Sequence, residues 1–228
     1  MASRLVTLAR KVAERVRPPK RRSWLESFRF RTVLDVGANT GQFAAEARAF
    51  APDAMIHSFE PLPDCYDDLV KNFRGDRRFR ARNLAVGDAR GSATFRRSSY
   101  SPSSSMLEMA KLHRDAFPET AGGSEVSVNV DTLDDLEPEL DLRAPVLLKI
   151  DVQGYEAHVL RGATHLLQKV DVAVVEMSIE PLYEGQTLFD GVYRMMVERG
   201  FLYRGNLVQL EHPADGRILQ VDGLFTRA

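Results

Sequence analysis

Short apolar runs alternate with amphipathic stretches along most of the chain, and this alternation predicts the fold. Residues 32–36 and 146–150 are mostly apolar, as expected for strands buried on both faces. Strands and helices in regular succession predict a parallel sheet with right-handed crossovers. The expected strands are 32–36, 54–59, 79–86, 92–96, 125–130, 146–150, 170–177 and 201–204, and the expected helices are 42–51, 64–73, 155–168 and 188–199.

Two segments depart from this alternation. Residues 207–211 and 223–226 could pair as an antiparallel hairpin at the edge of the sheet. Residues 98–105 include six serines in eight positions, which predicts a flexible loop. The loop is either a bare linker or a mobile lid over the site, and the pattern favours neither.

The first part of the chain differs from the rest in charge. Residues 1–31 carry ten basic and two acidic side chains, although the net charge of the whole chain is −1. Apolar residues at helical spacing predict a basic amphipathic helix over residues 3–16, ended by Pro18 and Pro19. We therefore predict an extension over residues 1–30 and one domain over residues 31–228. A solvated arm is the preferred interpretation, and contact of residues 1–22 with an anionic membrane surface or a partner is the alternative.

Composition excludes several classes of protein. A single cysteine, Cys65, cannot form an internal disulfide or a zinc finger, and the sequence has no run of 18 apolar residues. The first segment also lacks the apolar core of a secretory signal. We therefore expect a cytoplasmic protein that is at most peripheral at a membrane, with no role for nucleic acid.

The loop after the first strand is the first candidate site, because ligands of parallel sheets bind at the carboxyl ends of the strands. It holds Gly37 and Gly41, and Glu60 ends the second strand nineteen residues later, where a carboxylate can accept hydrogen bonds from a ribose diol. A pyrophosphate loop would need a third, middle glycine, which disfavours an NAD-linked oxidoreductase. The pattern suits a nucleoside without phosphate, such as S-adenosylmethionine, with Asp35 and the loop amides holding its amino-acid end.

Seven blocks in order carry a resemblance to a known family. Together they resemble the FkbM family of S-adenosylmethionine-dependent methyltransferases, over about residues 31–227. The resemblance implies a class I methyltransferase fold, in which helices cover both faces of a mostly parallel seven-stranded sheet whose last strand is antiparallel. It also implies methyl transfer to oxygen. The blocks are residues 33–41, 57–61, 83–88, 103–105, 130–134, 148–156 and 174–176.

The resemblance also assigns site residues. The cofactor loop would consist of Asp35, Gly37, Asn39 and Gly41, with Glu60 on the ribose. Asn83 and Asp88 would lie near the adenine. In the block Asp-x-Glu-Gly-x-Glu that is usual after the fourth strand, this chain has Gln153 in place of the first glutamate, which removes one negative charge from the mouth of the site.

Acid–base chemistry has three candidate residues. Lys149 and Asp151 are two apart on one strand and so point to the same face. Asp151 is the first candidate for acceptor binding or general base, with capping of the next helix or pairing with Lys149 as its structural alternatives. Glu176 ends an apolar strand, where a carboxylate is costly unless paired or placed at the open end. Glu156 is as well explained as an acid at a helix start, His57 is interpreted as a core residue, and no metal is expected.

The sequence therefore predicts an S-adenosylmethionine-dependent O-methyltransferase that acts on a hydroxyl of a sugar, glycan or secondary metabolite. The acceptor and the oligomeric state do not follow from it. The alternative is a nucleoside-binding module without turnover that docks on a partner or membrane through its basic arm.

Overall fold

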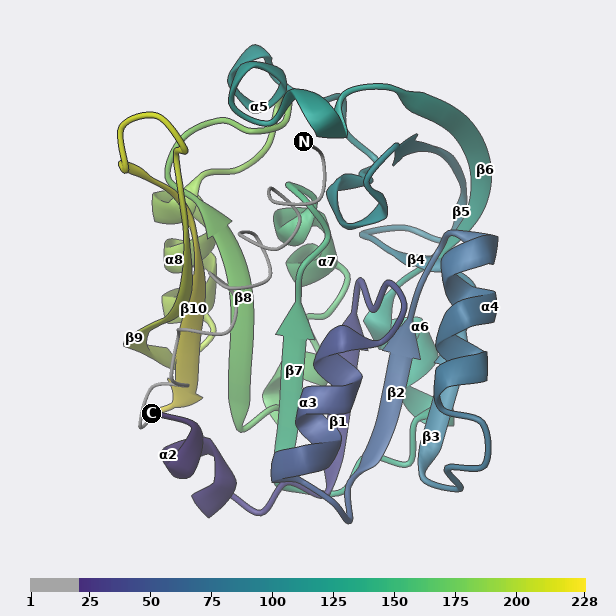
Figure 1. Cartoon of the computed structure of the whole chain (residues 1–228). Coiled ribbons are helices and arrows are strands. Elements are labelled where there is room, and N and C mark those ends of the chain that lie inside the picture. Colours follow the sequence, from purple (N-terminus) through teal and green to yellow (C-terminus); the bar gives the residue numbers. More distant parts are fainter. Residues whose placement is uncertain (1–20) are drawn as a thin grey trace, which may run out of the picture.

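One large sheet organises the chain, of which the computed structural model describes residues 21–228 (Figure 1). Its strands are β1 (Thr32–Val36), β2 (Met55–Phe59), β3 (Phe79–Arg82), β7 (Val146–Ile150), β8 (Val172–Ser178), β9 (Phe201–Glu211) and β10 (Ile218–Arg227). They lie in the order β3-β2-β1-β7-β8-β10-β9. β10 is antiparallel to both of its neighbours, whereas β1 pairs in parallel with β2 and β7. The predicted mostly parallel sheet with an antiparallel last strand is confirmed.

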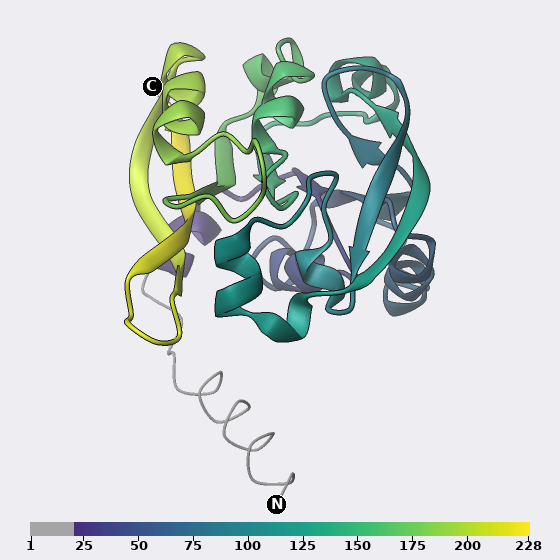
Figure 2. The same cartoon turned by 90° about the horizontal axis from the view of Figure 1, so that it is seen from above.

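Helices cover both faces of this sheet, as expected (Figures 1 and 2). One face packs against α2 (Arg21–Ser27), α3 (Gln42–Phe50) and α4 (Pro63–Asn72), around Val33, Ile56 and Leu147. The other packs against α6 (Leu133–Leu136), α7 (Glu156–Arg161) and α8 (Phe189–Glu198). β7 lies between two apolar layers because all five of its residues are buried. Within residues 21–228, no helix combines the length and the apolar character that crossing a bilayer requires.

A second, three-stranded sheet stands beside the carboxyl ends of β1 and β2 and was not predicted. It consists of β4 (Ala85–Val86), β6 (Gly123–Asp131) and β5 (Gly91–Ser98), in that order. The expected single strand over residues 79–86 is wrong, because the chain leaves the large sheet after β3. The Asn83 amide fixes this exit by donating to the carbonyl oxygens of Glu60 and Pro61, at 2.9 and 3.0 Å.

The serine-rich segment is a buried corner and not a flexible loop. β5 runs to Ser98, a 3₁₀ turn spans Ser101–Ser103, and Ser98, Ser103, Ser104 and Ser105 are buried. The Ser98 hydroxyl donates to the carbonyl of Thr120 at 2.6 Å, and the Ser104 hydroxyl accepts from the Ser98 amide at 3.0 Å. Composition misled the prediction because these hydroxyls satisfy the backbone of a tight corner. The short elements α5 (Lys111–Ala116), Pro118–Thr120, Glu137–Glu139 and Leu166–Lys169 complete the chain.

Two other boundaries differ from expectation. The helix expected over residues 155–168 ends at Arg161, where Gly162 packs so closely on Gly87 that an added Cβ would lie 2.0 Å from its carbonyl oxygen. The final strands are longer than expected, since residues 201–211 form one strand. The antiparallel hairpin at the edge is confirmed, but its expected register is wrong, because residues 223–226 lie opposite residues 202–206, and residues 209–211 lie opposite residues 218–221.

The predicted helix over residues 3–16 lies outside the described residues, but the residues just before β1 pack on the domain. Leu25 and Phe30 are buried in the same apolar cluster as Val33. The Phe30 ring stacks on Phe28 with centroids 5.4 Å apart. The domain boundary at residue 31 stays a prediction.

Truncation of Phe30 tests whether this segment belongs to the core. We expect Phe30→Ala to lower the free energy of unfolding by about 3–5 kcal/mol, because the side chain is 3% exposed and its loss leaves a cavity. Urea unfolding followed by circular dichroism measures the change. Trp24→Ala is the control, with a smaller expected loss because Trp24 is 39% exposed. A loss below about 1 kcal/mol for Phe30→Ala would show that residues before β1 are dispensable.

Candidate active site

The loop after β1 lies directly against the loop after β7. Gly37 has φ +79°, and an added Cβ would lie 1.8 Å from the carbonyl oxygen of Asp151. The amides of Gly37 and Ala38 donate to the carbonyl of Phe59 at 3.1 and 3.0 Å, which ties the loop to β2. Glycine is therefore required at position 37, and the carboxyl ends of β1, β2 and β7 meet at this point.

Gly41, in contrast, has a packing role. It precedes α3 and has φ +98°. An added Cβ would lie 2.5 Å from the ring of Phe73, which directly follows α4, and 2.9 Å from Leu69 in α4. Among the described residues, Gly41 is not part of the wall of a cavity at this edge. Gly41 is therefore needed for the packing of the loop against α4, and not for contact with a ligand in these cavities.

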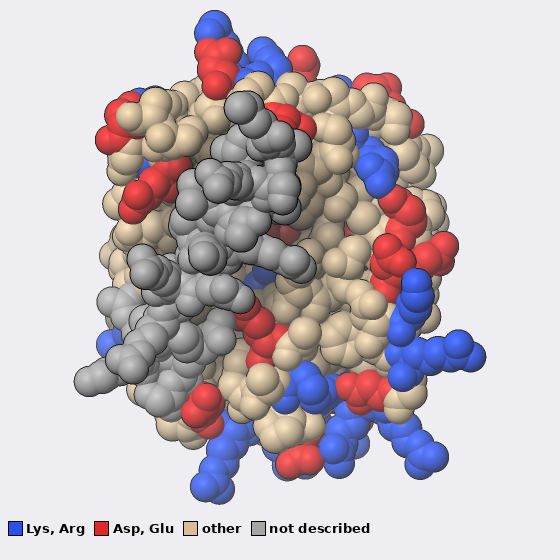
Figure 3. Space-filling model, viewed as in Figure 1, with Lys and Arg blue, Asp and Glu red and all other residues tan. Residues whose placement is uncertain are grey.

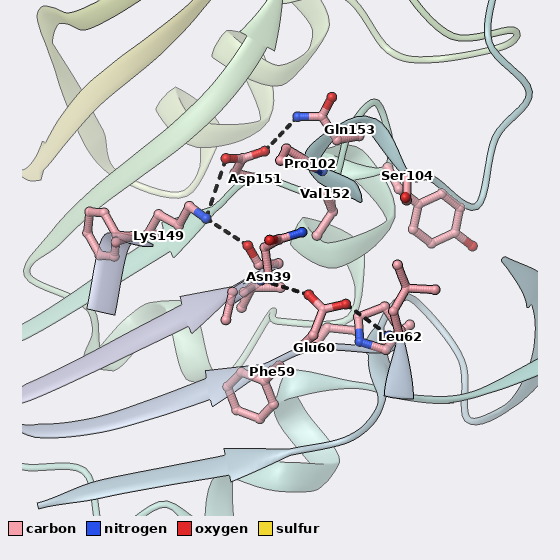
Figure 4. A pocket seen from close by; sticks show the side chains of 18 of the residues that line it. Asn39, Phe59, Glu60, Leu62, Pro102, Ser104, Lys149, Asp151, Val152 and Gln153 are labelled. Carbon is pink, nitrogen blue, oxygen red and sulfur yellow. Dashed lines mark hydrogen bonds and ion pairs between the residues drawn. The ribbon is translucent and has the colours of Figure 1, made fainter. Parts of the chain in front are cut away.

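Glu60 is fixed by two backbone amides. Its two carboxylate oxygens accept from Asn39 at 2.8 Å and from Leu62 at 2.9 Å, and its side chain is buried (Figure 4). Burial raises the pKa of Glu60 to about 7, against the lowering effect of these two hydrogen bonds. The Glu60 carboxyl group therefore has a fixed orientation, and its oxygens keep lone pairs that can accept hydrogen bonds from a ligand.

A cavity of about 290 Å³ opens at this edge of the large sheet. Its wall is apolar toward the small sheet and polar toward β7 (Figure 4). The basic side chains visible in Figure 3 gather mainly at the lower edge of that view, away from the carboxyl ends of the parallel strands. The lining includes Gly37, Asn39, Phe43, Phe59, Glu60, Leu84, Val86, Lys149, Asp151, Val152, Tyr155 and Asp222.

Lys149 lies at the centre of the polar wall. Its Nζ donates to the carbonyl of Gly37 at 3.0 Å and lies 3.4 Å from both Asp35 Oδ1 and Asp151 Oδ2. Burial alone would lower the pKa of Lys149, but Asp151 and Asp35 outweigh it and the pKa is raised. The pKa of the fully buried Asp35 is also raised, because burial exceeds the opposing effect of Lys149. Lys149 therefore links β1 to the loop after β7.

A second cavity of about 120 Å³ adjoins the first and shares Lys149, Asp151 and Asp222 with it. Glu176 of β8 lines only this second cavity, together with apolar side chains of α2, α3 and β9. Burial, followed by the charge of Asp151, raises the pKa of Glu176 well above its usual range. The two cavities meet at the carboxyl end of β7.

Gln153 connects the acids of this edge. Its Nε2 donates to Asp151 Oδ1 and to Glu176 Oε2, each at 2.8 Å, and its Oε1 accepts from the Tyr183 hydroxyl at 2.8 Å. Glu156 serves the backbone, since its Oε1 accepts from the amides of Val152 and Gly154 at 3.1 Å. The structural interpretation of Glu156 is therefore supported, whereas Gln153 lies closer to the candidate chemistry than its uncharged amide suggested.

Five of the predicted site residues line the first cavity, namely Gly37, Asn39, Glu60, Lys149 and Asp151, and Asp35 contacts Lys149 behind it. The assignments of Asn83 and Asp88 to the surroundings of the adenine stay predictions, and neither side chain lines either of the two cavities. The Asn83 amide holds the turn after β2, and Asp88 pairs with His158 at 2.8 Å and Arg161 at 3.4 Å beside α7.

Asp222 was missed by sequence reasoning. It lies on β10 opposite Glu176 of β8, and burial followed by the charge of Asp151 raises its pKa to about 7. No local motif marks this position, because Asp222 reaches the site only through the antiparallel return of β10. Tyr155 was missed as a wall residue as well, and its ring stacks on His158 with centroids 3.9 Å apart.

Comparison with known proteins gives consistent matches. Residues 35–203 match the model of the methyltransferase FkbM domain. The chain is 29% identical over 160 residues to the 2-O-methyltransferase NoeI of Sinorhizobium fredii, which covers 68% of this chain and 66% of the relative. It is 31% identical over 147 residues to the hexuronic acid methyltransferase AglP of Haloferax volcanii, which covers 64% of this chain and 55% of the relative. The chain thus matches less than two thirds of either relative.

A solved structure shows the same fold. The crystal structure of a methyltransferase FkbM from Methylobacillus flagellatus superposes with a TM-score of 0.52 at 13% identity. The superposition covers 87% of this chain and 44% of that chain. This likeness supports the arrangement of sheet and helices described above.

The raised pKa of Glu60 predicts a particular pH dependence of stability. Between its ordinary pKa of 4.5 and about 7, the folded protein binds a proton at Glu60 that the unfolded chain has released. This contribution to stability is complete below about pH 4.5 and is lost as the pH rises to about 7. Glu60→Gln lacks it, so we expect the stability of the variant relative to wild type to increase across this range, on the order of 3 kcal/mol.

Urea unfolding of wild type and Glu60→Gln at several pH values between 4 and 8 measures this difference. The other buried acids titrate in both proteins, so their contributions to the difference in unfolding free energy cancel to first order. A difference in unfolding free energy that stays constant with pH would mean that Glu60 keeps an ordinary pKa.

Proposed function

Because the chain belongs to the FkbM methyltransferase family, we propose that it transfers a methyl group from S-adenosylmethionine to a hydroxyl group of a sugar, glycan or secondary metabolite. The observation that carries the proposal is the buried Glu60 carboxylate beside the loop at Gly37, in the wall of a cavity at the carboxyl ends of β1 and β2. The oxygen acceptor and the sugar class are suggested by the names of the two relatives.

The residues of the first cavity fit S-adenosylmethionine better than a dinucleotide. A pyrophosphate site needs free backbone amides in the loop after the first strand. Here the amide of Asn39 donates to Glu60, and the amide of Thr40 donates to the Asn39 side-chain oxygen at 2.9 Å. The polar wall instead gathers carboxylates around one lysine, which suits a ligand with an ammonium and a sulfonium group.

Each part of the wall would then have a separate task. Glu60 would accept hydrogen bonds from the ribose hydroxyls, since its orientation is fixed by Asn39 and Leu62. The apolar wall of Phe59, Leu84 and Tyr155 would enclose the base. The loop at Gly37 would hold the amino-acid end, and Asp35, which does not line the cavity, would act on that end only through Lys149. Gly41, Asn83 and Asp88 would support or border the site without touching the ligand.

When bound, S-adenosylmethionine supplies a methyl group on a positively charged sulfur, which an acceptor oxygen displaces in line. The chain has to hold the acceptor in that line and take up its proton. Asp151 is the best placed residue for both tasks, because it lines both cavities and its side chain is 34% exposed. Lys149 and Gln153 each contact one of its oxygens and so fix its direction.

The second cavity is the proposed acceptor site. It joins the first at Lys149, Asp151 and Asp222, so an acceptor hydroxyl there would approach the carboxyl end of β7. Leu25, Phe50 and Leu207 give it an apolar side, and Glu176 and Asp222 give it hydrogen-bond acceptors. This combination suits one face of a sugar ring or of a hydroxylated natural product.

Isothermal titration with S-adenosylmethionine tests the cofactor assignment. Glu60→Ala should weaken binding by about 1–3 kcal/mol, or about 5- to 150-fold in Kd, because the ribose hydroxyls would lose their acceptor. Asp88→Asn is the matched control, with unchanged affinity expected because Asp88 is outside the wall. Equal affinity of Glu60→Ala and wild type would remove Glu60 from the site, and binding of NAD in place of S-adenosylmethionine would overturn the proposal.

Asp151→Asn tests the acid–base role. We expect turnover to fall about 100-fold or more, as for loss of a positioned base, while the Kd for S-adenosylmethionine changes about threefold at most. The assay measures methyl transfer to a panel of sugars and glycosides, with Asp53→Asn, an exposed aspartate at the opposite edge of the sheet, as control. Equal losses in turnover and affinity would make Asp151 structural. Cofactor binding without transfer to any acceptor would favour a binding module.

A further inference from the structure

The backbone of Gln153, in the loop between β7 and α7, has a conformation that is energetically unfavourable for a residue with a side chain. Its backbone has φ +54°, in the left-handed region that non-glycine residues rarely adopt, and Gly154 follows with φ +94°. The neighbouring structure holds this conformation, since the Ser105 hydroxyl donates to the Gln153 carbonyl at 2.6 Å. A loop that maintains such a conformation at a functional edge indicates that the direction of the side chain matters.

Both N–H groups and the oxygen of the Gln153 side-chain amide form hydrogen bonds. Both carboxylates, Asp151 and Glu176, accept from its Nε2 at 2.8 Å, and the Tyr183 hydroxyl donates to its Oε1. The amide thus lies between an acid from the end of β7 and an acid from β8. A proton on Glu176 would leave this bridge intact, because each N–H requires only a lone pair on the oxygen that it meets.

Acidic side chains outnumber basic ones around this bridge. Asp222 and Glu156 act on Glu176 from β10 and α7, and Asp35 and Glu46 lie further along the same edge. Lys149 is the basic side chain that lines both cavities among the described residues. A glutamate at position 153, which the family pattern would place here, would add a third carboxylate in contact with two others. Such a cluster requires an additional proton or a bound cation.

We propose that Gln153 is a positioning residue that holds Asp151 and Glu176 in a fixed pair by an uncharged bridge, in the place where a glutamate would need a proton or a divalent cation. The proposal rests on the proposed function only for the role of Asp151 in proton uptake. Under this proposal the two N–H groups, which point at both carboxylates, take the place of a bridging cation. The pair therefore keeps its geometry without metal.

Direct titration of the two carboxyl groups tests the proposal without cofactor or acceptor, so its failure is distinguishable from failure of the proposed function. The protein is labelled with carboxyl-¹³C aspartate and glutamate, and the signals are assigned with Asp151→Asn and Glu176→Gln. We expect Gln153→Glu to raise the midpoints at which the Asp151 and Glu176 signals titrate by about 1–3 pH units, because a third carboxylate is added in contact with both. Gln153→Met, of similar shape, should raise them as well, because the two N–H donors are lost.

Gln42→Glu is the matched control, because it introduces the same carboxylate in the wall of the same cavity at a position without contact to the pair. It should shift the two signals much less than Gln153→Glu. Thermal unfolding of every variant separates loss of fold from a change in titration, and Gln153→Met keeps the test open if Gln153→Glu does not fold.

Three outcomes would overturn the proposal. The first is an unchanged titration of Asp151 and Glu176 in both Gln153→Glu and Gln153→Met. The second is a change in melting temperature alone, which would make Gln153 a purely structural residue. The third is a shift of the Asp151 and Glu176 ¹³C signals of the wild-type protein on titration with Mg²⁺ that exceeds the shifts of the other carboxyl signals, which would show that a cation binds at the pair.

Discussion

The contact between the backbones at Gly37 and Asp151 determines where everything else in the site lies. A side chain at position 37 would lie 1.8 Å from the Asp151 carbonyl oxygen, so the loops after β1 and β7 can touch only because glycine is there. This contact brings the Lys149 ammonium within reach of the Gly37 carbonyl, Asp35 and Asp151. The same loop positions the Asn39 amide on Glu60. One close backbone approach thus aligns the groups of three strands.

The cost of this arrangement is the burial of several acids near one another. Desolvation raises the pKa values of Asp35, Glu60, Glu156, Glu176 and Asp222. The structure offsets part of that cost with groups of limited charge. Backbone amides donate hydrogen bonds to Glu60 and Glu156. The Lys149 ammonium pairs with Asp35 and Asp151, and the Gln153 amide donates to Asp151 and Glu176. An excess of acid remains, which is the condition under which a cationic ligand gains most from binding.

Local patterns predicted what depends on local chain properties. The apolar runs predicted β1 and β7, and Gly37 and Glu60 predicted the loop and the carboxylate that face the cavity. Asp222 was beyond reach of such reasoning because it meets Glu176 only through the pairing of β10 with β8. The buried serine corner was mistaken for a flexible loop because composition does not show which backbone groups the hydroxyls bind. The position of Asn83 and Asp88 after β3 depends on the exit of the chain from the large sheet, which no local pattern marks.

Under the proposed function, the two cavities and their shared wall would explain why polar side chains are so concentrated at the end of β7. A methyl donor and an acceptor have to meet along one line, so the groups that orient each of them have to converge on that line. Lys149, Asp151 and Asp222 belong to both cavities, whereas Glu60 lines only the first and Glu176 only the second. A carboxylate shared by both cavities has to keep one direction with either ligand present. Asp151 meets this requirement because its two oxygens are held by Lys149 and Gln153, which are themselves anchored in β7 and by the Tyr183 hydroxyl.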